Sequence, residues 1–200
     1  MRIKNTELVR RALMLLDESV EELEAAVSYG DMGMELRRLA TELVPEAVRK
    51  VMLEAPLDRI DESLALEGDY RTEAGIGELT LPEDYLRLVE LRMAGWDVGL
   101  HEYTGPVASG ERGWTGRVLR HHPDAIRTAE AKDQAAGVWL GRKAEGRVLR
   151  ISGISDDRPP LVAQYLPAPK DGTAMLWIPS ALVYEAAHEL ARMVRTVITE

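Results

Sequence analysis

Apolar residues recur every three or four positions over residues 8–16, which is the spacing of one face of an α-helix. Asn5 and Thr6 precede this run and are candidate N-caps. At residues 19–22 the pattern Ser-x-x-Glu lets a hydroxyl and a carboxylate each satisfy a free backbone N–H. This pattern predicts a second, short helix that stops near Gly30.

A third apolar run covers residues 36–52 and contains Pro45. A proline either kinks one long helix or occupies the first position of a new one. Both alternatives give a helical hairpin or bundle over residues 1–57, whose apolar faces need a covering element. The chain also closes with an amphipathic run over residues 179–200, in which Pro179 stands near the helix start.

Between these regions the pattern changes to short apolar runs separated by Gly and Pro, which is typical of strands. Residues 147–151 alternate charged and apolar side chains between Gly146 and Gly153, which predicts a half-buried antiparallel strand. Residues 103–136 begin rich in Gly and Ser, and we expect a long loop or arm there. The predicted strands lie at residues 78–81, 86–93, 138–140, 147–151 and 161–165.

The order of elements predicts an α+β fold in one domain of residues 1–200. It combines an N-terminal helical bundle or hairpin over 1–57 with a β-rich region over 76–178 that includes the arm. The C-terminal helix over 179–200 is expected to pack on the N-terminal helices.

Composition is that of an ordinary globular chain, with 46% hydrophobic and 30% charged residues among 200. Cys is absent, which excludes disulfides and thiol chemistry, and Phe is absent, which leaves four Trp and six Tyr as the aromatic residues. We expect no membrane segment and no signal peptide, because the apolar stretches are short and the N-terminus is charged.

The formal net charge is −9, and residues 1–70 carry 9 Lys and Arg against 16 Asp and Glu. Proteins that bind nucleic acid present a basic face that displaces counterions, and no stretch of this sequence provides one. We therefore expect no sequence-specific nucleic-acid binding.

Catalytic motifs are weak throughout. His188–Glu189 lacks the second His one helical turn later that a zinc protease needs, since position 192 is Arg. His121 and His122 are adjacent and point to opposite sides of an extended chain, which favours a surface turn. Asp156 and Asp157 precede two prolines, which favours a strand connection over a Mg²⁺ site. We therefore predict no catalytic residue, no metal and no cofactor.

These observations favour a role in protein assembly over a catalytic role. In a chain without Phe, Trp residues are the bulky parts of the core and of interfaces. Within the arm, the glycine-rich segment 103–116 is the candidate for reaching a neighbouring subunit. The candidate interface residues are Tyr103, Trp114 and Trp177.

Four segments of the sequence resemble the head–tail connector or adaptor proteins of tailed bacteriophages. The first two are Leu-Val-Pro-Glu-Ala-Val-Arg at 43–49 and Glu-Ala-Pro-Leu at 54–57. The third and most telling is Leu-Thr-Leu-Pro-Glu-Asp-Tyr-Leu-Arg-Leu-Val at 79–89, and the fourth is Ile-Pro at 178–179, which leads into the final helix. In the third segment we expect a bend at Pro82, with Tyr85 and Leu86 anchoring the next strand against the helices.

The resemblance implies a structural virion protein that self-assembles into a ring, a dodecamer, between the portal protein and the tail proteins. DNA would pass through the ring, and an acidic lumen would repel its phosphates. The protein would be assembled in the bacterial host cytoplasm and reside in the virion neck. Two alternatives stay open, a small cytoplasmic protein–protein binding module and, with less support, a hydrolase-like enzyme.

Overall fold

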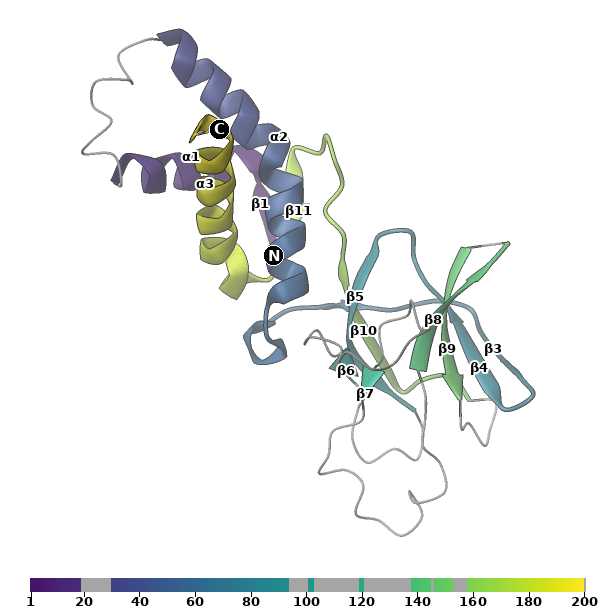
Figure 1. The fold of residues 1–200 in the computed structure, drawn as a ribbon. Helices are drawn as coiled ribbons and strands as arrows, with labels where there is room; N and C mark the ends of the chain where they lie inside the picture. The colour runs from purple at the N-terminus through teal and green to yellow at the C-terminus, as the bar shows by residue number, and fades with distance from the viewer. Residues whose placement is uncertain are drawn as a thin grey trace. The chain divides into compact units, whose positions relative to one another are not determined.

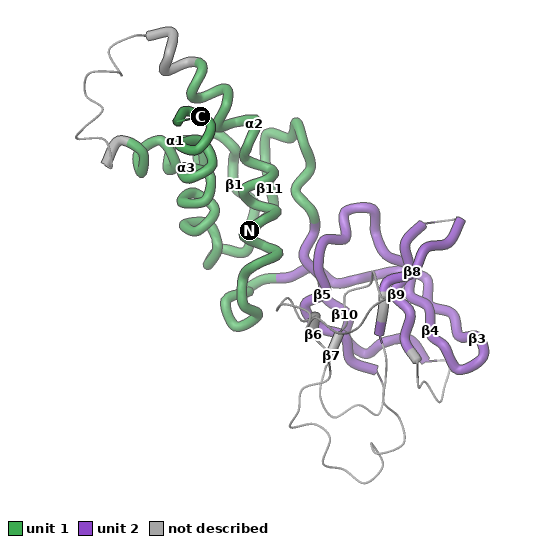
Figure 2. Tube along the Cα trace, in the orientation of Figure 1, with its two compact units in different colours: residues 1–62, 168–200 green, residues 63–167 purple. Residues whose placement is uncertain are grey.

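The computed structural model describes residues 1–18, 30–93, 101–102, 119–120, 138–144, 146–152 and 158–199. The chain forms two compact units, coloured separately in Figure 2. Unit 1 combines Met1–Glu62 with Ala168–Glu200, and unit 2 is Ser63–Pro167. Unit 2 is therefore inserted into the chain of unit 1.

The boundaries of these units differ from those of the helical and β-rich regions that the sequence predicted within one domain. Strands begin at residue 64 in unit 2, before the expected start at 76. Residues 168–178, expected in the β-rich region, belong to the helical unit because their strand pairs with the first residues of the chain.

The described part of unit 1 contains three α-helices, two short 3₁₀ helices and a two-stranded antiparallel ribbon (Figure 1). Its elements are β1 (Arg2–Lys4), α1 (Asn5–Glu18), α2 (Gly30–Glu54), η1 (Leu57–Arg59), β11 (Met175–Trp177), η4 (Ser180–Leu182) and α3 (Val183–Thr199).

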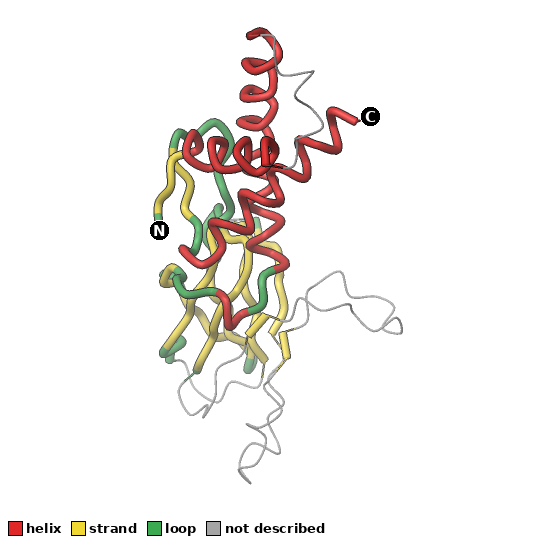
Figure 3. The backbone as a smooth tube through the Cα atoms, turned by 90° about the vertical axis from the view of Figure 1, so that its left-hand side faces the viewer, coloured by secondary structure: helices red, strands yellow, loops and turns green. Residues whose placement is uncertain are grey.

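The helix α3 packs on both α1 and α2, and Figure 3 shows these helices in a view turned by 90°. Small residues make this packing close, because a methyl side chain lets two helix backbones approach. The alanines that are fully buried are Ala12, Ala40, Ala47, Ala186 and Ala187. The predicted α+β class and the packing of the C-terminal helix on the N-terminal helices are confirmed.

Pro45 lies inside α2, which runs without interruption from Gly30 to Glu54. Of the two alternatives for this proline, the structure therefore has one long helix. The short helix predicted over residues 19–29 lies outside the described residues.

The described residues of unit 2 form antiparallel strands in three sheets, with the orders β2-β10-β5, β3-β4-β9-β8 and β6-β7. Its strands are β2 (Leu64–Ala65), β3 (Tyr70–Glu73), β4 (Ile76–Thr80), β5 (Tyr85–Arg92), β6 (His101–Glu102), β7 (Leu119–Arg120), β8 (Val138–Lys143), β9 (Gly146–Ser152) and β10 (Val162–Pro167). The five predicted strands correspond to β4, β5, β8, β9 and β10.

Leucine and tyrosine side chains fill the core of unit 2. Leu88, Leu91 and Leu149 are fully buried, and the rings of Tyr85 and Tyr165 stack with centroids 6.0 Å apart. We expected Tyr85 to anchor its strand against the helices. It packs instead among the strands of unit 2, because its partner Tyr165 stands on the neighbouring strand β10.

The bend at Pro82 is held by Arg147 of β9. The Arg147 Nη2 atom donates to the carbonyls of Glu83 and Tyr85, each at 2.9 Å. Its guanidinium also lies over the Tyr85 ring, 5.7 Å from the centroid. The run 79–89 that carries the phage resemblance thus spans the end of β4, the turn after it and the start of β5, and a cation from β9 fixes the turn.

Candidate functional site

The ribbon of β1 and β11 has one buried face and one outward face. Ile3 pairs with Leu176, and both side chains are buried. Because side chains alternate along a strand and opposite residues share a face, the neighbours of this pair lie on the other face. We call the side chains there the outward face: Arg2 opposite Trp177, and Lys4 opposite Met175.

This outward face is cationic in an acidic chain. Arg2 and Lys4 are both exposed, and among the described residues no carboxylate lies within ion-pair distance of either. Met175 is 48% exposed and Trp177 is half-buried. Arg, Met and Trp are residue types enriched at protein interfaces.

A groove of about 820 Å³ opens at the end of the ribbon and shares Lys4 and Met175 with the outward face. Thr41, Glu42 and Pro45 of α2 contribute to its wall. Because proline has no N–H, the Thr41 carbonyl lacks the helical donor that residue 45 would otherwise supply. The groove therefore lies beside a helix carbonyl without its usual partner.

Asn5 lies at the start of α1 and also lines the groove. We expected this side chain to be an N-cap. Its Nδ2 atom donates to the Thr173 carbonyl at 2.6 Å, and its backbone N–H donates to the Ala174 carbonyl at 3.1 Å. The Asn5 Oδ1 atom is buried and has no hydrogen-bond partner, so Asn5 fastens α1 to the segment before β11 and does not cap the helix.

The groove offers both hydrogen-bond acceptors and a cation. The acceptors are the Thr41 carbonyl and the carboxylates of Glu42 and Asp171, of which Glu42 already accepts from Arg38 at 3.1 Å, and the cation is Lys4. The residues that line the groove include no histidine and no nucleophile with an adjacent base. This arrangement suits the binding of a polar group.

Among the described residues, no group of three His, Asp or Glu side chains could hold a metal ion. No helix in the described part of the chain is long and apolar enough to cross a membrane.

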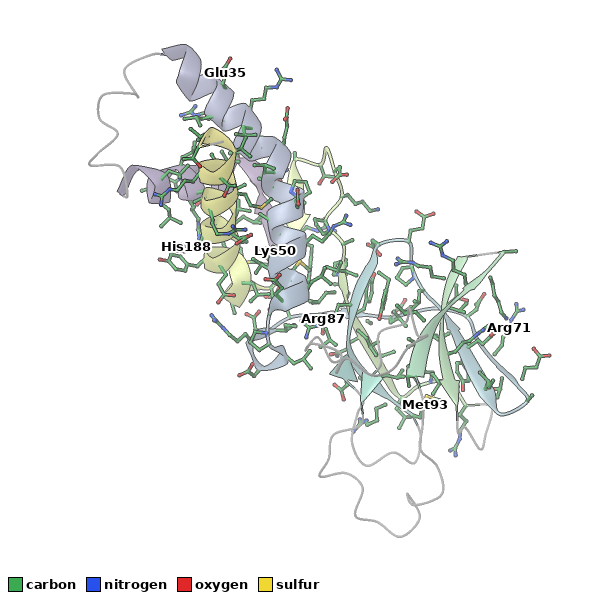
Figure 4. All side chains as sticks on the ribbon, viewed as in Figure 1. Glu35, Lys50, Arg71, Arg87, Met93 and His188 are labelled. Atoms are coloured by element: carbon green, nitrogen blue, oxygen red, sulfur yellow. The ribbon has the colours of Figure 1, made fainter. Side chains whose placement is uncertain are left out.

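Of the predicted interface residues, Trp177 lies on the outward face, and Tyr103 and Trp114 lie outside the described residues. His121, His122, Asp156 and Asp157 also lie outside them. His188 is exposed on α3, on the side away from α2, as Figure 4 shows. Its ring meets Tyr184 edge-on with centroids 4.4 Å apart.

Two carboxylates with lowered pKa values stabilise α3. Glu189 accepts from Arg192 Nη2 at 2.6 Å and pairs with Lys50 Nζ of α2 at 2.9 Å; these cations, Arg192 first, lower its pKa to about 2. Asp61 accepts from the Ser180 hydroxyl at the start of η4, and this hydrogen bond lowers its pKa. Both groups hold the terminal helix in place.

In unit 2, the shifted pKa values likewise belong to pairs that hold strands together. Glu78 of β4 pairs with Lys143 of β8 and with Arg150 of β9, and these cations, Lys143 first, lower its pKa. Burial, followed by the charge of Asp84, raises the pKa of Tyr165 to about 12. The Tyr165 hydroxyl donates to Asp84 at 3.2 Å, beside the bend at Pro82.

Sequence reasoning missed Arg2, Lys4 and Met175. The only sequence signal was alternation of polar and apolar residues over 2–4 and 175–177. Three residues are too few to indicate a strand, because helical and extended spacing cannot be told apart over such a length.

No protein-family model, curated protein or solved structure matches this chain.

Proposed function

We propose that this protein is a structural component of a tailed-phage neck. Copies of it assemble into a ring that joins the portal protein to the tail and lets DNA pass. The observation that carries the proposal is the outward face of the ribbon. There Arg2 and Lys4, which have no ion-pair partner among the described residues, stand beside exposed Met175 and half-buried Trp177. Such a combination suits contact with another protein surface.

The sequence supports the same function. The segment 79–89 resembles phage connectors, and the net charge of −9 suits a channel through which DNA slides. An acidic lumen repels phosphates and so avoids the counterion release that makes DNA bind. A ring structure with a basic lumen would contradict this part of the proposal.

The first experiment is to sequence the DNA on both sides of the gene. We expect reading frames for a portal protein, a capsid protein and an ATP-driven packaging motor. The second step is to mix the protein with the purified portal ring and to examine the mixture by sedimentation and electron microscopy. We expect a ring of this protein docked on the portal. Metabolic or regulatory neighbours, together with failure to bind any portal, would refute the assignment.

The groove beside Asn5 favours a second candidate, a protein–protein binding module. In that case the groove would bind a polar side chain from a single partner, and the complex would have one copy of each protein. Light scattering at equilibrium separates the two candidates by stoichiometry.

A further inference from the structure

A loop of unit 2 carries two carboxylates, separated by one residue as are the two cations of the outward face and opposite to them in charge. Among the described residues, Glu67 and Asp69 are the one pair of exposed carboxylates that stand two positions apart with no cation within ion-pair distance of either. They lie between β2 and β3 and flank Gly68. We call residues 66–69 the acidic loop.

The acidic loop is held at both of its ends. The Leu66 N–H donates to the Ala163 carbonyl at 2.8 Å, and the Thr80 N–H donates to the Asp69 carbonyl at 3.0 Å. Gly68 lies so close to the β4 end that an added Cβ would stand 2.1 Å from the Thr80 oxygen. Glu67 and Asp69 are therefore carried by a fixed backbone, which lowers the entropy lost when a partner binds.

The two pairs have compatible spacing. Arg2 and Lys4 are two positions apart on a strand, so their Cα atoms are about 7 Å apart. Glu67 and Asp69 are also two positions apart, and two residues of chain reach at most about 7 Å. Because the side chains of Arg, Lys and Glu are long, the cation pair and the carboxylate pair can form two ion pairs at once.

We propose that Arg2 and Lys4 of one copy pair with Glu67 and Asp69 of a second copy. This inference rests on the proposed function, because it names the surfaces through which neighbouring copies meet. The two patches stand on different parts of the chain, so a ring needs them to meet head-to-tail. In that arrangement each copy keeps one patch free for the next copy, and the contact generates a ring when the rotation closes. Met175 and Trp177 supply the apolar part of the interface.

Two double variants reverse the charges separately, one being Arg2→Glu with Lys4→Glu and the other Glu67→Lys with Asp69→Lys. Each places like charges opposite one another, so we expect each alone to assemble at least about tenfold less than the unaltered protein. Mixed in equal amounts, the two variants can alternate, because every contact then joins opposite charges. We expect the mixture to regain assembly. Sedimentation velocity of the full chain, alone and with the portal ring, measures both effects.

Matched controls change the same charge elsewhere on exposed side chains. Arg37→Glu with Arg49→Glu matches the first variant, and Glu46→Lys with Asp58→Lys matches the second. We expect both controls to assemble within about twofold of the unaltered protein, because they change net charge without touching either patch. Circular dichroism checks that every variant is folded. If a double variant is unfolded, the single changes Lys4→Glu and Asp69→Lys replace it.

The outcomes separate this inference from the function on which it rests. If each double variant assembles like the unaltered protein, the pairing is wrong and the connector function stands. If each fails alone and the folded mixture also fails, the two patches do not meet each other, and the pairing is again wrong. If the unaltered chain assembles neither alone nor on a portal, the proposed function fails and the pairing with it.

Discussion

The two units pack their cores by different means. In unit 1, alanines on the packed helices are fully buried, Ala47 of α2 and Ala187 of α3 among them, together with larger side chains such as Leu190. In unit 2, leucines and the stacked pair of Tyr85 and Tyr165 fill the space among strands. A chain without phenylalanine can therefore build one core from close backbone approach and another from tyrosine, provided that the Tyr165 hydroxyl finds Asp84.

The largest expected effects come from truncating one buried leucine in the core of each unit. Leu190 of α3 and Leu149 of β9 are both fully buried. We expect Leu190→Ala and Leu149→Ala each to lower the free energy of unfolding by about 3 kcal/mol, through lost contacts and a cavity. Hydrogen exchange read by mass spectrometry should show faster exchange in the unit that carries the change. Equally faster exchange in both units for either variant would show that the two units unfold together and that their cores are not independent.

Enlarging a small residue tests the close approach of the helices directly. Ala187 is fully buried on α3, so we expect Ala187→Leu to force the helices apart at a cost of about 2 kcal/mol. Ala181, which is exposed in η4, is the matched control, and Ala181→Leu should change the melting temperature little. A tolerated leucine at position 187 would mean that small residues do not set the helix spacing.

A smaller effect is expected from the cation that fixes the bend of unit 2. Arg147→Ala removes hydrogen bonds to two carbonyls and the contact with Tyr85, and we expect a loss of about 1–2 kcal/mol in chemical denaturation. Arg142→Ala is the control, because Arg142 stands exposed on the neighbouring strand. Equal effects of the two variants would show that the bend does not depend on Arg147.

The smallest expected effect is a dependence of the stability of unit 1 on pH. The pKa of Glu189 is lowered to about 2 in the folded protein, from an ordinary value of 4.5. Because the pKa of Glu189 is lower in the folded protein than in the unfolded one, the ionised carboxylate stabilises the fold at pH values above its unfolded pKa. This stabilisation is lost as the pH falls from about 4.5 towards 2. Since the side chains of Arg192 and Lys50 are 58% and 40% exposed, solvent screens their charges and the loss should be about 1 kcal/mol.

Thermal melting of Glu189→Gln over this pH range provides the measurement. The variant should lack part of the acid destabilisation that the unaltered protein shows, whereas Glu46→Gln, at an exposed position on α2, should keep it. Identical pH profiles for all three proteins would contradict the role assigned to Glu189.

The sequence predicted the elements with long patterns and missed the short ones. The helices at residues 8–16 and 182–197 and the strand at 147–151 follow from periodicity, and all three occur. The ribbon was missed because Arg2–Lys4 and Met175–Trp177 become strands only by pairing across 170 residues of chain. The groove was missed for a similar reason, since Asn5, Thr41 and Asp171 come together through tertiary packing alone.

The insertion of unit 2 into unit 1 has a consequence for the order of events during synthesis. Residues 63–167 leave the ribosome before α3 has been made, so unit 2 has its whole sequence available first. At about 5–20 residues per second, the apolar faces of α1 and α2 wait on the order of ten seconds for α3. The speed of translation therefore sets how long these faces remain without their partner helix.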